Sequence, residues 1–168
     1  MKHLATALAI GLTLTTAAAY ATDGTITING NLIANTCTIN GGNGDITVNL
    51  PTLSAATLSS AGKTAGSTKF TITLSNCSAT SAKTFFEAGA TINGNSGNLI
   101  NNGTAANVEV QFLNDQGQAI NLATQANSQQ VNITNQAANL NYQAQYFATA
   151  AATPGTVSTS VKYSISYN

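Results

Sequence analysis

Charge is scarce in this sequence. Asp, Glu, Lys and Arg make up only 6% of the residues, whereas soluble domains usually carry about 25%. Arginine and tryptophan are absent, and five lysines balance five acidic residues. A nucleic-acid-binding protein needs several cationic side chains on one face to neutralise phosphates. This composition excludes that class, and Asn, Thr, Ser and Gln must provide the solvated surface instead.

The first 21 residues have the features of a secretory signal peptide. Lys2 and His3 form a short basic start, an uncharged apolar run covers residues 4–20, and Ala19-Tyr20-Ala21 offers a small-x-small cleavage pattern. A membrane anchor is the alternative, but a short run rich in Ala and Thr that ends in a cleavage site favours a signal peptide. Cleavage before Thr22 leaves 147 of the 168 residues, a normal size for one domain.

After this cleavage, the sequence contains few of the residue types that enzymes use for catalysis. The only histidine, His3, leaves with the signal peptide, so Ser/His/Asp and Cys/His nucleophile systems are excluded. The remaining acids are scattered and give no sign of a carboxylate pair. A glycine-rich stretch at 41–45 matches part of a calcium-binding repeat, but it occurs once and is better interpreted as a turn. We therefore expect no catalytic residue, no cofactor and no metal.

Cys37 and Cys77 are the two cysteines of the sequence. An even number of cysteines in an exported chain predicts a disulfide, with two buried thiols as the alternative. Two sulfurs without a histidine make a poor metal site.

Two-residue alternation of apolar and polar side chains, typical of β-strands, recurs along the chain. It covers residues 26–34, 46–50, 70–74 and 108–112, and residues 142–147 form a further apolar-aromatic run. Turn sequences bound these segments: Asn40-Gly41-Gly42, Asn93-Gly94-Asn95, Asn102-Gly103 and Asn114-Asp115-Gln116-Gly117. One helical turn is predicted at Ser54–Ser60, with Ser54 as its cap. The pattern indicates an all-β sandwich or barrel.

The two ends of the mature chain carry the most regular alternation. Near the start, one face holds Ile26, Ile28, Gly30, Leu32 and Ala34. At the end, one face holds Val157, Thr159, Val161, Tyr163, Ile165 and Tyr167, and the other face is Ser or Lys. A strand with one buried face needs this pattern, because a one-residue slip would turn every apolar side chain outward.

Taken in order, these segments resemble the chaperone–usher fimbrial major subunits of the type 1 pilus kind. The resemblance rests on residues 24–30 leading to Cys37, residues 70–77, residues 108–117, residues 146–155, and the closing residues 163–168 with a penultimate tyrosine. It implies an incomplete immunoglobulin-like β-sandwich that lacks one strand and has an N-terminal donor-strand extension. The implied organisation is a signal peptide at 1–21, the extension at 22–36 and a pilin domain at 37–168.

The resemblance also implies the site and its partners. The donor face would be Ile26, Ile28, Gly30, Leu32 and Ala34. The wall of the acceptor groove and the contact with a periplasmic chaperone would be Val161, Tyr163, Ile165, Tyr167 and Asn168. Other partners would be identical or related subunits and an outer-membrane usher, and the product would be a cell-surface fimbrium that contributes to adhesion.

Alternatives stay open at this point. The chain could be a minor adaptor or tip-associated subunit, since such a subunit also carries a donor strand. It could instead be a secreted immunoglobulin-like domain that stays monomeric, with residues 26–34 paired inside their own domain. Tyr167 could be an ordinary packed aromatic residue.

Overall fold

The computed structural model of this chain describes Gly24, residues 26–30 and residues 37–167. The chain divides into two compact units, Met1–Leu32 and Ile33–Asn168. In the first unit, the described residues belong to no helix or strand. None of the helices formed by the described residues is long and apolar enough to cross a membrane. The predicted signal peptide lies outside the described residues.

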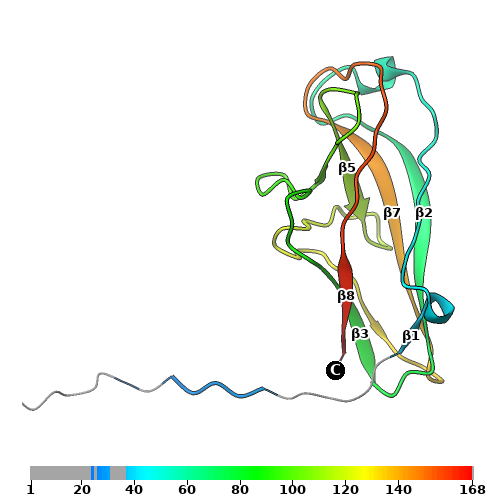
Figure 1. The fold of residues 1–168 in the computed structure, drawn as a ribbon, viewed down its shortest axis with the longest axis vertical. Helices are drawn as coiled ribbons and strands as arrows, with labels where there is room; N and C mark the ends of the chain where they lie inside the picture. Colours follow the sequence, from blue (N-terminus) through cyan, green and yellow to red (C-terminus); the bar gives the residue numbers. More distant parts are fainter. Residues whose placement is uncertain (1–23, 25, 31–36, 168) are drawn as a thin grey trace, which may run out of the picture. The chain divides into compact units, whose positions relative to one another are not determined.

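The second unit is built from strands in two sheets (Figure 1). Its strands are β1 (Thr38–Ile39), β2 (Thr64–Ser75), β3 (Ser81–Phe86), β4 (Leu99–Ile100), β5 (Val108–Leu113), β6 (Gln130–Asn132), β7 (Ala138–Ala148) and β8 (Tyr163–Tyr167). Two 3₁₀ turns, η1 (Asn40–Gly42) and η2 (Ala55–Leu58), lie in the first connections. This confirms the all-β prediction.

The larger sheet has the order β1-β2-β7-β5-β4 and the smaller one the order β6-β3-β8, with every pair antiparallel. The long pair β2–β7 runs from Thr64 opposite Phe147 to Leu74 opposite Ala138. Its register shifts between Ala65 and Thr68, around Gly66 at φ +70°. Positive φ is the region that glycine adopts without strain, so Gly66 permits this bulge.

The core joins the two sheets through aromatic side chains. Phe70 from β2 and Tyr142 from β7 lie 5.5 Å apart between ring centroids, and Phe86 from β3 lies 5.9 Å from Tyr142. The Tyr142 hydroxyl donates to Thr84 Oγ1 of β3 at 2.8 Å, and both residues are buried. This bond satisfies two polar groups that would otherwise destabilise the interior.

A disulfide joins Cys37 and Cys77, as the sequence predicted. It ties the residue before β1 to the loop after β2, where the Cys77 amide also donates to the Gln136 carbonyl at 3.0 Å. The start of the folded body is therefore fixed covalently to the loop that follows the long strand β2.

Several predicted elements are confirmed and others differ. Residues 70–74, 108–112 and 142–147 lie in β2, β5 and β7, and the Ser54 hydroxyl accepts from the Ala56 amide at 3.3 Å to cap η2. Residues 46–50 and 157–162 keep the predicted alternation of buried and exposed side chains, but they belong to no sheet. The sequence missed β3, because its buried residues Ser81, Ala82, Thr84 and Phe86 include only one large apolar side chain and give no clear apolar alternation.

Loss of the disulfide tests its role in stability. We expect Cys37→Ser to lower the free energy of unfolding by about 2–5 kcal/mol, because the unfolded chain regains the entropy of the closed loop. Urea unfolding of the exported subunit measures this. The double variant Cys37→Ser/Cys77→Ser is the control and should match the single one. Native stability in Cys37→Ser would contradict the prediction.

Alkaline pH should destabilise the fold through Tyr142. Burial raises the pKa of Tyr142 to about 12, Thr84 lowers it and Asp115 raises it slightly. The unfolded tyrosine ionises near pH 10, so its stability contribution is full below about pH 10 and is lost as pH rises towards 12. The loss reaches about 3 kcal/mol, because a shift of one pKa unit corresponds to about 1.4 kcal/mol.

Urea unfolding followed between about pH 8 and pH 12 measures this loss. The pKa values of Tyr146 and Tyr163 are raised too, so Tyr142→Phe should retain part of the pH dependence. An unchanged slope in Tyr142→Phe would rule out Tyr142 as the main source.

Candidate functional site

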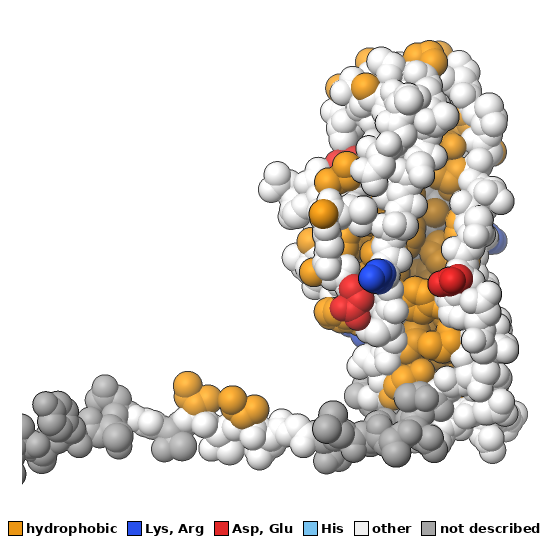
Figure 2. All heavy atoms as spheres, in the orientation of Figure 1, with side chains coloured by type: hydrophobic (Ala, Val, Ile, Leu, Met, Phe, Trp, Pro, Cys, Tyr) orange, Lys and Arg blue, Asp and Glu red, His pale blue; other side chains and the backbone are white. Residues whose placement is uncertain are grey.

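A groove of about 1020 Å³ opens along one side of the sandwich. Two extended segments border it: residues 44–50, here called the N-terminal wall, and residues 157–163, here called the C-terminal wall. Figure 2 shows a stripe of hydrophobic side chains in the hollow between two mostly polar surfaces, with basic and acidic side chains beside it.

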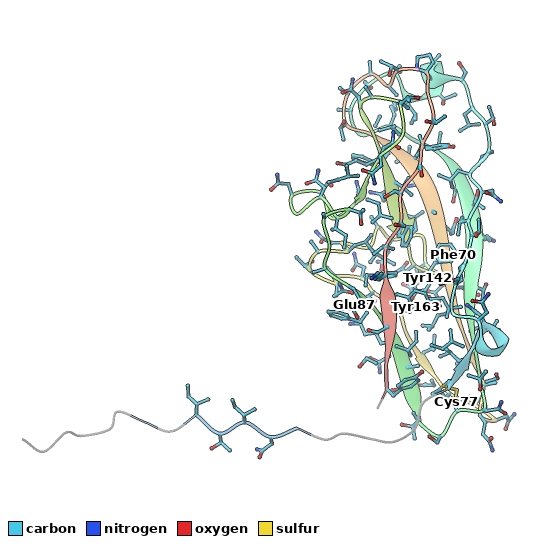
Figure 3. The ribbon with its side chains drawn as sticks, viewed as in Figure 1. Phe70, Cys77, Glu87, Tyr142 and Tyr163 are labelled. Carbon is cyan, nitrogen blue, oxygen red and sulfur yellow. A yellow bond between two sulfur atoms is a disulfide. The ribbon has the colours of Figure 1, made fainter. Side chains whose placement is uncertain are left out.

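The floor of the groove is part of the hydrophobic core. Ile72, Phe86, Leu99 and Val110 are nearly fully buried within the chain and still line it. They come from both sheets, so the groove lies where the sandwich should close. Phe70, on the floor, and Tyr163, at the start of β8, are labelled in Figure 3.

The walls present the inward faces that the sequence alternation predicted. The inward side chains are half-buried: Ile46, Val48 and Leu50 on one wall, and Val157, Thr159, Val161 and Tyr163 on the other. An incoming strand would therefore meet apolar side chains on two sides and below. Thr159 differs, because its buried Oγ1 has no hydrogen-bond partner among the described residues.

The backbone of the C-terminal wall is satisfied on one side only. The carbonyls of Ser158 and Lys162 accept from the Asn102 and Glu87 amides at 2.8 and 2.9 Å. In an extended chain, successive residues direct their amide and carbonyl groups to opposite sides. The backbone groups of residues 157, 159 and 161 therefore point the other way, and within the described chain they make no hydrogen bond.

The N-terminal wall is held at its two ends by tyrosine hydroxyls. Tyr163 donates to the Gly44 carbonyl, and Tyr146 donates to the Pro51 carbonyl at 3.2 Å. Burial raises the pKa of both tyrosines, and Asp45 adds to the effect on Tyr163. Both hydroxyls thus remain protonated donors at neutral pH. Between these ends, the backbone of residues 46–50 bonds to no other described residue.

The structure places only some of the residues predicted for the groove wall in the groove. Val161 and Tyr163 line the groove. Ile165 and Tyr167 continue the same face, half-buried against the core, and the Tyr167 hydroxyl accepts from the Cys37 amide at 3.2 Å. Asn168 lies outside the described residues. Sequence reasoning did not assign Ile46, Val48 and Leu50 to the groove, although their alternation was visible.

Three of the five residues predicted for the donor face are described. Ile26 and Ile28 are 90% and 89% exposed. A Cβ added at Gly30 would meet no atom within 4 Å. Leu32 and Ala34 lie outside the described residues. Two isoleucines in the open are unusual, because burying each would stabilise a protein by about 1.5–3 kcal/mol.

The side chains that line the groove do not form a catalytic arrangement. Asp45 and Lys162 are the charged residues along it, one on each wall. In the portion of the chain described here, no three His, Cys, Asp or Glu residues gather as a metal site would require. Its geometry fits an extended apolar chain segment.

These features define a class of protein: an immunoglobulin-like sandwich that lacks one strand and has an open groove in its place. The comparisons identify the family within that class. The family described as Fimbrial protein matches residues 26–168. This chain belongs to that family, as a fimbrial subunit of the chaperone–usher type.

Curated relatives match nearly end to end. The chain is 48% identical over 162 residues to the Major fimbrial subunit SMF-1 of Stenotrophomonas maltophilia, covering 90% of this chain and 96% of the relative. It is 38% identical over 179 residues to the F17 fimbrial protein of Escherichia coli, covering 99% of each.

Solved structures agree on the fold. A subunit of a chaperone–usher pilus, from a structure that addresses rod uncoiling, matches with a TM-score of 0.66 at 21% identity and covers 94% of this chain and all of its own. The P pilus rod subunit PapA matches with a TM-score of 0.61 at 18% identity, covering 79% of this chain and 99% of its own.

Hydrogen exchange tests the open walls. In the unpolymerised subunit, the amides of residues 46–50, 157, 159 and 161 should exchange quickly because they are unbonded, whereas those of β7 should be protected. The Ser158 amide, which donates to Asn101 Oδ1 at 2.9 Å, is the internal control and should exchange more slowly than its neighbours. Protection equal to that of β7 along both walls would mean that the groove is closed in solution.

Proposed function

We propose that this chain polymerises into a cell-surface fimbrium by inserting its N-terminal extension into the groove of the next copy. The observation that carries the proposal is the pair of complementary features in one chain. One is a groove with unpaired backbone on both walls, and the other is a segment with exposed Ile26 and Ile28 in alternation. Strand addition of this kind gains backbone hydrogen bonds for affinity and side-chain pockets for specificity.

The donor face would be Ile26, Ile28, Gly30, Leu32 and Ala34. Burial of the three large side chains contributes roughly 5–9 kcal/mol before the cost of ordering the segment. The durability of a fibre would depend on slow unfolding more than on this equilibrium sum. The corresponding organisation is a signal peptide at 1–21, an extension at 22–36 and the pilin domain at 37–168.

Export would require that the groove be covered before assembly, since walls with unpaired backbone and half-buried apolar side chains promote aggregation. A periplasmic chaperone would cover it, with Val161, Tyr163, Ile165, Tyr167 and Asn168 on the wall it contacts, and an outer-membrane usher would catalyse the exchange of strands. The role is structural, with no catalysis and no cofactor. The similarity to a major subunit over nearly the whole chain favours the shaft over an adaptor position.

Gly30 provides the sharpest test. Glycine weakens a strand interior, and neither a positive φ nor a close contact among described residues explains it. Close approach to an acceptor chain would explain it. Gly30→Leu should then block insertion, because the added side chain overpacks a closed site at about 1–3 kcal/mol or more.

We expect Gly30→Leu to give normal periplasmic subunit with few or no fibres in electron micrographs. Asn29→Leu is the matched control, because the same side chain then points away from the groove and fibres should persist. Fibres of native number and heat resistance from Gly30→Leu would overturn the donor-strand assignment.

A further inference from the structure

The N-terminal wall has an unusual attachment to the rest of the sandwich. From residue 46 to residue 50 its backbone bonds to nothing else in the described chain. Its ends are held by two side chains from different strands, Tyr163 of β8 at Gly44 and Tyr146 of β7 at Pro51. The backbone of the N-terminal wall is therefore anchored at two points by tyrosine hydroxyls, while Ile46, Val48 and Leu50 pack against the hydrophobic core.

The length of a tyrosine side chain sets the distance between the N-terminal wall and the C-terminal wall. Adjacent hydrogen-bonded strands lie about 4.8 Å apart, and a tyrosine side chain plus a hydrogen bond spans more than that. Tyr163 belongs to the C-terminal wall, so its hydrogen bond to Gly44 connects the two walls. While this bond is formed, the backbones of the two walls cannot pair with each other directly, and the space between them remains.

The other end of the N-terminal wall is held by Tyr146 of β7, a strand of the larger sheet. Tyr146 packs over the bulge at Gly66, where an added Cβ would meet its ring carbons at 3.0 and 3.1 Å. This packing fixes the direction of the ring and aims the hydroxyl at Pro51. Leu53, which follows Pro51 by two residues, packs against the same bulge, since its Cδ1 also lies 3.0 Å from the Cβ added at Gly66.

We propose that Tyr163 and Tyr146 are positioning residues that hold the empty groove at the width of one strand, ready to accept the incoming segment. The proposal rests on the proposed function. Apparent affinity falls in proportion to the fraction of molecules in the competent conformation. A groove that closes when empty would therefore accept a strand more slowly.

The two hydroxyls act on the empty groove and not on the filled one. Once a strand is seated, its own backbone bonds to both walls fix their separation. Loss of a hydroxyl should therefore lower the association rate and leave the dissociation rate unchanged. A side chain that merely stabilised the assembled product would instead change the dissociation rate.

The experiment uses a fluorescent peptide of residues 24–35 and the whole unpolymerised mature chain, with both rates measured by anisotropy. We expect Tyr163→Phe and Tyr146→Phe each to lower the association rate about five-fold, and the double variant about twenty-five-fold, from the usual net contribution of a hydrogen bond. Tyr142→Phe is the matched control, because it removes a hydroxyl bonded to Thr84 away from the groove. Its association rate should stay native.

Unchanged association rates in the double variant, or raised dissociation rates, would overturn the proposal that Tyr163 and Tyr146 hold the empty groove at the width of one strand. A loss equal to that of Tyr142→Phe would also overturn it, because general destabilisation would then account for the effect. Failure of the unaltered chain to bind the peptide would overturn the proposed function itself, and so distinguishes the two.

Discussion

The absence of one strand is the constraint on which the rest of the structure depends. A sandwich buries the inner faces of both sheets, and each strand needs a neighbour for its backbone groups. Here two extended segments have apolar inner faces but lack that neighbour, and the core residues Ile72, Phe86 and Val110 line the groove between them. Completion from outside satisfies the backbone and the core in one step.

The scarcity of charge fits a subunit that packs against copies of itself. Low net charge weakens the repulsion between copies, and neutral polar side chains take over tasks that arginine or lysine perform elsewhere. Glu109 is an example, because it is buried yet accepts from Asn93 Nδ2, Ser96 Oγ and Asn98 Nδ2 at 2.7, 2.8 and 3.0 Å. Neutral donors compensate this carboxylate for its lost water.

Tyrosine hydroxyls connect the two ends of the folded body. Tyr167 contacts the Cys37 amide beside the disulfide, Tyr163 contacts Gly44, and Tyr146 contacts Pro51. Each ring contributes apolar area to the sandwich while its hydroxyl reaches a backbone group at the edge. Tyr163 and Tyr167 of β8 thus position the start of the body through their side chains, since no backbone ladder joins these segments among the described residues.

The sequence by itself determined the all-β class, the disulfide and the alternating face of the C-terminal segment, because period-two patterning and paired cysteines are local signals. It did not reveal β3, where Thr84 is buried through its bond to Tyr142, 58 positions away. Nor could it show that residues 46–50 and 157–162, which alternate like any strand, would remain unpaired. Alternation reports which face is buried, whereas backbone pairing depends on which segments become neighbours. Only the tertiary structure decided that.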